Sequence, residues 1–363
     1  MAPQALSLEE GLGNFLMVQA AAENELKAMY IIGEETAFSD SNTHNVHSAF
    51  ENLDFLVVQD MFFSRTAQFA DVVLPACPSV EKEGSFVNTE RRIQRFYQVM
   101  APLGDSRPDW KILTELAARM GHDWGYTHPE EIMAECAAIA PLFAGVNYER
   151  LKAWRSLQWP VAEDGTDTPL LYTDGFPTED GKASLYPLKW EAPKEAPDDT
   201  FDLMLNNGRV LEQFQGTNQT GCSPGIREQV SRGFIEVSPE LAKERGIEDG
   251  TWLRITSRRD SLELPALVTA RVAGKTLFTP IHFGTLGVNA LTGEHTDPVV
   301  QTPAYKETAV RLEVLDKRPA SPLPSNNYRY GQRTPNEGVA VEVKWANSDY
   351  APPPAQQIDP RKM

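Results

Sequence analysis

Cysteine is scarce in this sequence, with three residues among 363. Cys77, Cys136 and Cys222 lie far apart, and no two of them form a CxxC pair. The cysteines of this chain alone therefore cannot build a zinc or iron–sulfur site of the usual spacing. An odd number of isolated cysteines favours reduced thiols, so we expect a cytoplasmic protein.

Positive charge is also in deficit. The chain has 34 Lys and Arg against 51 Asp and Glu, a net charge of −17 and a pI near 4.9. This balance argues against a nucleic-acid partner, because such proteins usually carry a basic patch. It argues equally against an anionic membrane surface. A local cluster of Arg and backbone N–H groups can still bind an anionic ligand.

Long hydrophobic runs are missing as well. No apolar run approaches 18 residues, so we expect no direct membrane insertion. Residues 1–19 lack the basic region and apolar core of a signal peptide. With 41% hydrophobic and 23% charged residues, the composition is that of an ordinary globular protein. The length suffices for two or three domains.

Three short apolar runs, at residues 28–33, 55–60 and 70–75, are typical of buried parallel strands. With the intervening polar loops and helical patterns, they predict a doubly wound, Rossmann-like α/β region over residues 1–125. Ligands of such sheets lie at the carboxyl ends of the strands. The residues at these ends are Gly33, Glu34, Glu35, Gln59 and Asp60. Ordinary helix capping is an equally open interpretation of them.

Helical patterns cover residues 8–25 and 45–52, and Asp109 is placed to cap a helix that runs to Met120. Residues 126–200 contain one more helical pattern and then a stretch rich in Pro, Asp, Gly and Thr. We interpret them as a helical and irregular connection between domains.

From residue 201 the pattern becomes mostly β, and short strands with one or two short helices predict a closed barrel over residues 201–317. Expected strands after the first lie at residues 234–237, 252–255, 266–272, 276–283 and 309–314. Residues 318–363 are rich in proline and are expected to form an extended tail.

Residues 201–221 open as a strand and then turn at Asn206-Asn207-Gly208-Arg209. The segment that follows is dense in amides, hydroxyls and glycine, including Thr217 and Thr220. Such a loop suits close approach to a polar ligand, and the planar fork of Arg209 suits phosphate. A solvated loop that binds nothing is the alternative.

Several motifs stand at separate points of the chain. They are YIIGE at 30–34, VVQD at 57–60 with Thr66, ADVVLP at 70–75, EGSFVNTERR at 83–92 with Gln94, RPDW at 107–110, GR at 208–209, and NALT through DP to PAYK within 289–306. Together they resemble, in the same order, the C-terminal half of the catalytic (alpha) subunit of molybdenum or tungsten formate dehydrogenases. These enzymes belong to the bis-molybdopterin-guanine-dinucleotide oxidoreductase superfamily.

The resemblance implies that the barrel is of the double-psi type and that the chain binds a molybdopterin guanine dinucleotide with Mo or W. It implies that Asp109 and Glu35 are candidates to accept the guanine edge, and that Gln59 and Asp60 suit ribose hydroxyls. Arg209, Thr217 and Thr220 then suit pyrophosphate. The residues suited to the pterin and its phosphate arm are Asn289, Tyr305 and Lys306. The implied cofactor-binding set also includes Gly33, Glu34, Asn207 and Gly208.

The chain departs from the family pattern at two points. Glu35-Thr36 stands where relatives commonly have Asn or Asp followed by Pro, and Gln213-Phe214-Gln215 stands where they often have histidines. Neither the four-cysteine cluster motif, nor the Cys-His or selenocysteine-His metal ligand, nor the active-site Arg of the N-terminal half is present. We therefore expect no catalytic residue and no metal ligand in this chain.

An N-terminal catalytic half or subunit is expected to supply the metal ligand and the iron–sulfur cluster, and electron-transfer subunits are further expected partners. A split subunit and a truncated reading frame both remain open. A related nitrate-reductase-like oxidoreductase and a non-catalytic scaffold or cofactor-binding protein are the alternative functions.

Overall fold

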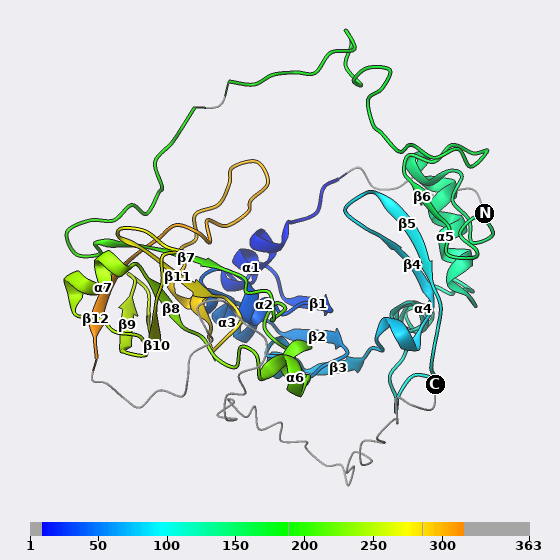
Figure 1. Cartoon of the computed structure of the whole chain (residues 1–363). Helices are drawn as coiled ribbons and strands as arrows, with labels where there is room; N and C mark the ends of the chain where they lie inside the picture. Colours follow the sequence, from blue (N-terminus) through cyan, green and yellow to red (C-terminus); the bar gives the residue numbers. More distant parts are fainter. Residues whose placement is uncertain (1–8, 188, 285, 316–363) are drawn as a thin grey trace, which may run out of the picture.

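The computed structural model describes residues 9–187, 189–284 and 286–315. The expected tail at residues 318–363 lies outside the described residues. The strands form three groups, namely a parallel sheet, a small antiparallel sheet and a closed barrel (Figure 1). Within the described part of the chain, no helix is both long enough and apolar enough to cross a bilayer.

The parallel sheet has the order β1-β2-β3, with the central strand β2 hydrogen-bonded to both neighbours. Its strands are β1 (Ala28–Ile32), β2 (Phe55–Asp60) and β3 (Val72–Pro75), and its helices are α1 (Asn14–Ala22), α2 (Thr36–Ser39), α3 (Thr43–Glu51) and the 3₁₀ helix η1 (Thr66–Phe69). The three predicted strands are therefore present. Leu56 and Val58 of β2 are buried beneath α1 and α3, as continuous apolar runs in such strands require.

Two local predictions were wrong. The first helix begins at Asn14 and not near residue 8, because Gly11 and Gly13 interrupt the pattern and residues 9–13 are not helical. The loop expected after β1 contains the short helix α2, whose Phe38 is buried. This helix lies between the sheet and the barrel, where packing outweighs the weak local propensity.

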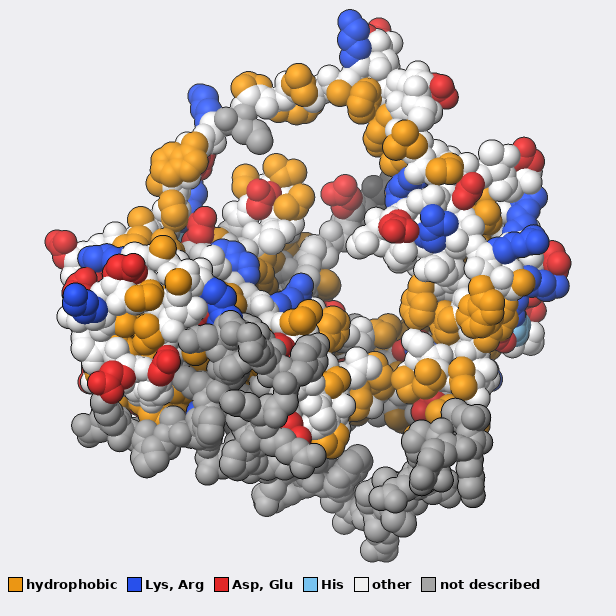
Figure 2. Space-filling model, in the orientation of Figure 1, with side chains coloured by type: hydrophobic (Ala, Val, Ile, Leu, Met, Phe, Trp, Pro, Cys, Tyr) orange, Lys and Arg blue, Asp and Glu red, His pale blue; other side chains and the backbone are white. Residues whose placement is uncertain are grey.

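The small antiparallel sheet has the order β4-β5-β6. Its elements are β4 (Gly84–Val87), β5 (Arg92–Phe96) and β6 (Ser156–Gln158), preceded by η2 (Ser79–Glu81) and accompanied by α4 (Asp109–Arg119), α5 (Pro129–Ile139) and η3 (Pro141–Phe143). We call β4, β5, β6 and α5 the small module. An opening separates this module from the rest of the described surface in the space-filling view (Figure 2). The predicted boundary at residues 125–126 falls between β5 and β6 of one sheet, and the domain boundaries stay predictions.

The barrel closes in the order β10-β8-β11-β7-β12-β9 and mixes parallel and antiparallel pairs. Its strands are β7 (Leu203–Gly208), β8 (Ile235–Val237), β9 (Trp252–Thr256), β10 (Ser261–Val268), β11 (Thr276–Pro280) and β12 (Thr308–Val314), and its helices are η4 (Thr220–Cys222), α6 (Pro224–Arg227), α7 (Pro239–Arg245) and η5 (Val288–Leu291). The predicted fold class, a parallel α/β sheet followed by a closed β barrel, is confirmed.

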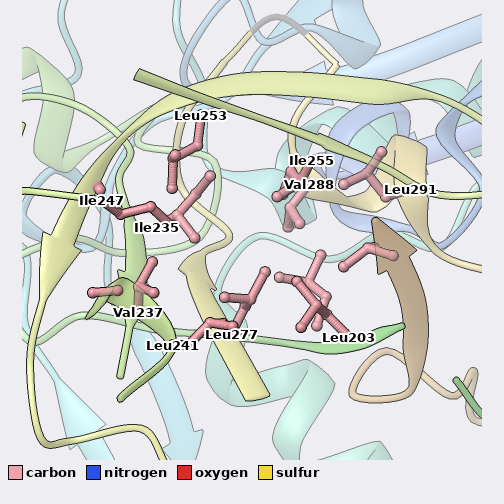
Figure 3. Close-up of a cluster of buried hydrophobic side chains, with 14 residues drawn as sticks. Leu203, Ile235, Val237, Leu241, Ile247, Leu253, Ile255, Leu277, Val288 and Leu291 are labelled. Carbon is pink, nitrogen blue, oxygen red and sulfur yellow. The ribbon is translucent and has the colours of Figure 1, made fainter. Parts of the chain in front are cut away.

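The barrel interior is filled by aliphatic side chains from strands that are distant in sequence. Leu203, Ile235, Leu253, Ile255 and Leu277 are fully buried and point toward one another (Figure 3). This packed interior leaves the strand ends and loops of the barrel as the places where a ligand can bind.

Candidate cofactor-binding site

Gln59 is the centre of a hydrogen-bond chain at the carboxyl edge of the parallel sheet. Its side chain is fully buried, accepts a hydrogen bond from the hydroxyl of Tyr30 at 2.5 Å and donates one to the carboxylate of Asp109 at 2.8 Å. The other carboxylate oxygen of Asp109 accepts from the ammonium of Lys82. Burial, helped by the charge of Asp109, raises the pKa of the Tyr30 hydroxyl. The structure thus brings together Gln59 and Asp109, two residues predicted from different motifs.

Asp109 does not cap its helix as the sequence suggested. The helix begins at Asp109 itself, with Pro108 at the N-cap position and no side-chain cap. Because the carboxylate turns toward Gln59 and Lys82, it belongs to the sheet edge. Asp60 follows Gln59 on the same edge and accepts from the backbone N–H of Phe62 at 3.2 Å. Burial raises the pKa of the Asp60 carboxyl.

Glu35 is buried and joins the sheet to the barrel. One carboxylate oxygen accepts from the backbone N–H of Arg65 at 2.9 Å and lies 3.5 Å from the Arg65 guanidinium, while the other accepts from the Asn218 amide. Both oxygens are thus engaged by protein donors. Gly33 and Glu34, the neighbours in the predicted set, are exposed at the end of β1.

Arg65 extends this contact across the junction. Its guanidinium donates to the carbonyls of Gly216 at 2.9 Å and Gly284 at 3.1 Å, and it lies 3.9 Å from the ring centroid of Phe38. The desolvation that accompanies burial lowers the pKa of Arg65. No local sequence signal marked Arg65, because all of its partners except Glu35 and Phe38 lie in the barrel loops.

The amide- and hydroxyl-rich loop at residues 213–221 is held by its own side chains. The Thr220 hydroxyl donates to the Gln213 amide oxygen at 2.7 Å, and the buried Gln213 amide donates to the Val230 carbonyl at 2.7 Å. Thr217 has a left-handed backbone with φ of 66°, and its carbonyl accepts from the Gly221 N–H at 2.7 Å. The loop is therefore a built structure and not a freely solvated segment.

Asn207 and Asn289 form a buried pair where the barrel meets α2. The Asn207 amide donates to the Asn289 side-chain oxygen at 3.1 Å, and the Asn289 amide donates to the Ser39 carbonyl at 2.6 Å. Lys306 donates to the backbone carbonyl of Asn207. The turn predicted at residues 206–209 was placed too early, because β7 runs to Gly208, where a Cβ would lie 2.7 Å from the Phe278 ring.

Arg209 and Lys306 place two cations next to each other on the barrel. Arg209 is exposed and makes no hydrogen bond or ion pair with any residue that the structure describes. Burial lowers the pKa of Lys306, and the charge of Arg209 lowers it further. The same two causes lower the pKa of His282, which is fully buried between the Val210 N–H at 3.0 Å and the Gln215 carbonyl at 2.6 Å. His282 is thus a structural histidine, while the Arg209–Lys306 pair suits an anion.

Tyr305 lines a cavity of about 280 Å³ between the sheet helices and the loop that precedes β12. Burial and the nearby charge of Asp40 raise the pKa of Tyr305 to about 12. Burial also raises the pKa of Asp40, whose carboxylate accepts from the Asn14 amide at 2.6 Å. The hydroxyl oxygen of Ser41, another lining residue, is buried without a hydrogen-bond partner.

Sequence reasoning missed Arg65, Lys82, Asp40 and Phe38. In the described ranges, no three His, Cys, Asp or Glu side chains converge as a metal site. The binding roles assigned to individual residues stay predictions.

Two family models match this chain. The molybdopterin oxidoreductase model matches residues 2–119, and the molybdopterin dinucleotide-binding domain model matches residues 203–309. The first match contains the parallel sheet with Gln59 and Asp109, and the second contains the barrel with Arg209 and Lys306.

Curated relatives are similar over nearly the whole chain. "Probable oxidoreductase YjgC" of Bacillus subtilis (strain 168) is 52% identical over 346 residues, which are 95% of this chain and 35% of the relative. A "Putative formate dehydrogenase" of Staphylococcus aureus (strain USA300) is 48% identical over 361 residues, which are 98% of this chain and 36% of the relative. The chain therefore spans about a third of the length of these relatives.

Among solved structures, acetylene hydratase from Pelobacter acetylenicus has the same fold, with a TM-score of 0.67 and 18% sequence identity. The match covers 82% of this chain and 46% of that protein.

Proposed function

We propose that this chain, in which the molybdopterin oxidoreductase and molybdopterin dinucleotide-binding domain models both match, binds the guanine dinucleotide tails of a molybdopterin cofactor within a formate dehydrogenase. The observation that carries the proposal is the Arg209–Lys306 pair at the end of β7. Two adjacent cations that have no carboxylate partner among the described residues are unfavourable in isolation, and a pyrophosphate would compensate both.

The sheet edge fits the guanine end of such a cofactor. Guanine presents an N1–H and an exocyclic amine, which a carboxylate accepts in a bidentate manner. Asp109 has that carboxylate, and Gln59 and Lys82 hold it in place. Asp60 adds a carboxylate that suits ribose hydroxyls, whereas the buried Gln59 amide is already engaged by Tyr30 and Asp109. Glu35 fits less well, because its carboxylate is buried and accepts from Arg65 and Asn218, whereas the Asp109 side chain is 32% exposed.

The residues predicted to bind the pterin and its phosphate arm are Asn289, Tyr305 and Lys306. Asn289 and Lys306 are hydrogen-bonded to Asn207, and Tyr305 lines the neighbouring cavity. A tyrosine hydroxyl is protonated at neutral pH, so that of Tyr305 is available as a donor.

When bound, a molybdenum or tungsten cofactor supplies a metal centre that takes up the two electrons released as formate becomes CO₂ and a proton. The residues of this chain bind and orient the cofactor. In our proposal, polypeptide equivalent to the rest of the relatives supplies the metal ligand and the iron–sulfur cluster. The proposal places this assembly in the cytoplasm, and the three free cysteines support that placement.

The test is a purification of the tagged chain from its own cells, followed by analysis of metal, released guanine nucleotide and accompanying polypeptides. We expect molybdenum or tungsten, about two guanine nucleotides per complex, a cysteine-rich polypeptide and formate oxidation with an artificial acceptor. If the complex reduced nitrate and did not oxidise formate, the proposed substrate would be wrong and the proposed cofactor role would stand. A complex without pterin or metal would overturn the cofactor role and favour a scaffold.

A further inference from the structure

A long strap connects the small module to the barrel and is fixed at both ends. The strap consists of residues 170–187 and 189–194 and forms the arch in Figure 1. At its start, the Arg91 guanidinium donates to the carbonyls of Thr168 at 3.0 Å and Pro169 at 3.1 Å. At its end, the buried carboxylate of Glu195 pairs with Arg258 at 2.9 Å and Arg259 at 2.6 Å.

Between these two anchors, the strap makes only local contacts. The hydrogen bonds recorded for the described strap residues join strap residues to each other, as in the Phe176 N–H to Gly181 carbonyl bond at 3.0 Å. Tyr172 stacks on Phe176 with ring centroids 4.9 Å apart. The anchors therefore hold the ends of a segment whose middle has no cover from the described part of this chain.

The uncovered middle carries large apolar side chains. Leu185 is 92% exposed, Trp190 85%, Tyr186 79% and Leu170 70%. Figure 2 shows hydrophobic side chains along the arch and open space beneath it. The exposure of several large apolar side chains on one segment favours an interaction surface, because ordering a segment costs conformational entropy that burial of its apolar surface must offset.

We propose that the strap binds around the polypeptide equivalent to the two-thirds of the relatives that has no counterpart in this chain. The Bacillus and Staphylococcus relatives match 95% and 98% of this chain, yet the match is only 35% and 36% of their own length. These relatives therefore contain a large additional stretch of polypeptide. That stretch can cover the exposed apolar side chains of the strap, so no second copy of this chain is needed to cover them. The inference rests on the proposed function, because the proposed function assigns the metal ligand and the iron–sulfur cluster to that polypeptide.

The test compares the tagged full chain with two double variants, each expressed in its own cells. Leu185→Ser/Trp190→Ser removes two apolar groups from the strap. Val99→Ser/Met120→Ser removes two exposed apolar groups, 80% and 70% exposed, from outside the strap and the binding site. Circular dichroism and thermal unfolding confirm that all three chains fold. Peptide sequencing identifies any co-purifying polypeptide by similarity to the unmatched part of the Bacillus relative.

We expect the strap variant to retain that polypeptide at least about tenfold less well than the wild type, and the control variant to retain it normally. Hydrogen exchange of residues 170–194 should slow in the complex relative to the chain alone. Equal retention by both variants, an unprotected strap or a solitary chain would overturn the inference. If the wild-type chain self-associates and the strap variant does not, the strap binds a second copy of this chain and the inferred partner is wrong. Pterin and nucleotide content, measured on the same samples, reports separately on the proposed function.

Discussion

The carboxylate of Glu35 and the guanidinium of Arg65 lie 3.5 Å apart at the junction between the parallel sheet and the barrel. Both side chains are largely buried, and each also contacts a barrel loop, Glu35 through Asn218 and Arg65 through Gly216. The pair therefore fixes the position of the polar loop relative to the sheet edge. In this chain, Glu35 has the geometry of a residue that positions the site.

Glu35→Ala is expected to destabilise the chain by about 2–4 kcal/mol, because it leaves a buried guanidinium without its carboxylate. The free energy of unfolding in urea measures the effect. Glu313→Ala is the control, since Glu313 is an exposed carboxylate 2.9 Å from Arg254 and its loss should cost at most about 1 kcal/mol. Equal costs for the two variants would show that the Glu35 contacts contribute no more than a surface pair.

The sequence predicted those parts of the fold that depend on local pattern. The strands at residues 28–32 and 55–60 were recognisable because a buried parallel strand needs a continuous apolar run. The helix at residues 239–245 is also locally encoded, because Ser238 caps its first turn and Gly246 ends it in the left-handed conformation.

The contacts across the junction left no such pattern. Asn218 reaches Glu35 across 183 positions of sequence, and Asn289 reaches Ser39 across 250. Such pairs depend on how the barrel docks on α2, which no periodicity encodes. For the same reason the sequence identified Gln59 and Asp109 as separate candidates but could not predict that one binds the other.

Arg209→Ala is expected to lower the affinity for inorganic pyrophosphate by roughly tenfold or more, because a charge-assisted hydrogen bond contributes about 1.5–3 kcal/mol. The same change should move the pKa of Lys306 upward, since the charge of Arg209 is one of the two causes that lower it. Calorimetric titration measures the affinity. Arg311→Ala is the control, because Arg311 is an exposed arginine on β12 with no recorded partner in the described chain. An unchanged affinity for the Arg209 variant would contradict the anion site.

Asp109→Asn is expected to remove a preference for guanosine diphosphate over inosine diphosphate, which lacks the exocyclic amine. The amide presents only one acceptor oxygen, so the bidentate contact is lost, and we expect binding of the guanine nucleotide to weaken by about tenfold. Asp105→Asn is the control, because Asp105 is exposed outside this hydrogen-bond chain. A preference that survives in the Asp109 variant would place the guanine elsewhere.

The raised pKa of Tyr305 should make the free energy of unfolding depend on pH in the alkaline range. Its pKa rises from 10 in the unfolded chain to about 12 in the folded one, so the folded state holds the proton more tightly in that range. The stabilisation is complete below pH 10 and is lost as the pH rises toward 12. Tyr305→Phe should therefore lose less stability than the wild type between pH 9.5 and 11, as measured by urea unfolding. Parallel losses in both chains would rule out this source of the effect.

Gly287 tests how closely α2 packs into the barrel. Its φ is 69°, and a Cβ there would lie 2.7 Å from the ring of the buried Phe38. Gly287→Ala should destabilise the chain by about 2–4 kcal/mol, because backbone strain adds to the clash. Gly274→Ala, at φ of 57° with open space around it, is a control for a positive φ without a clash and should cost only about 1 kcal/mol.

A double-mutant cycle separates the two contributions at Gly287. In a Phe38→Ala background the clash is absent, so Gly287→Ala should cost no more than the strain, and the two changes should be non-additive by at least about 1 kcal/mol. Additive costs would mean that Phe38 and Gly287 do not contact each other. Gly287→Ala alone should also disturb the Gly284 carbonyl that Arg65 binds, because Gly284 and Gly287 lie in the same barrel loop. Loss of that contact would appear as faster hydrogen exchange in residues 213–221, which connects the packing of α2 to the order of the polar loop.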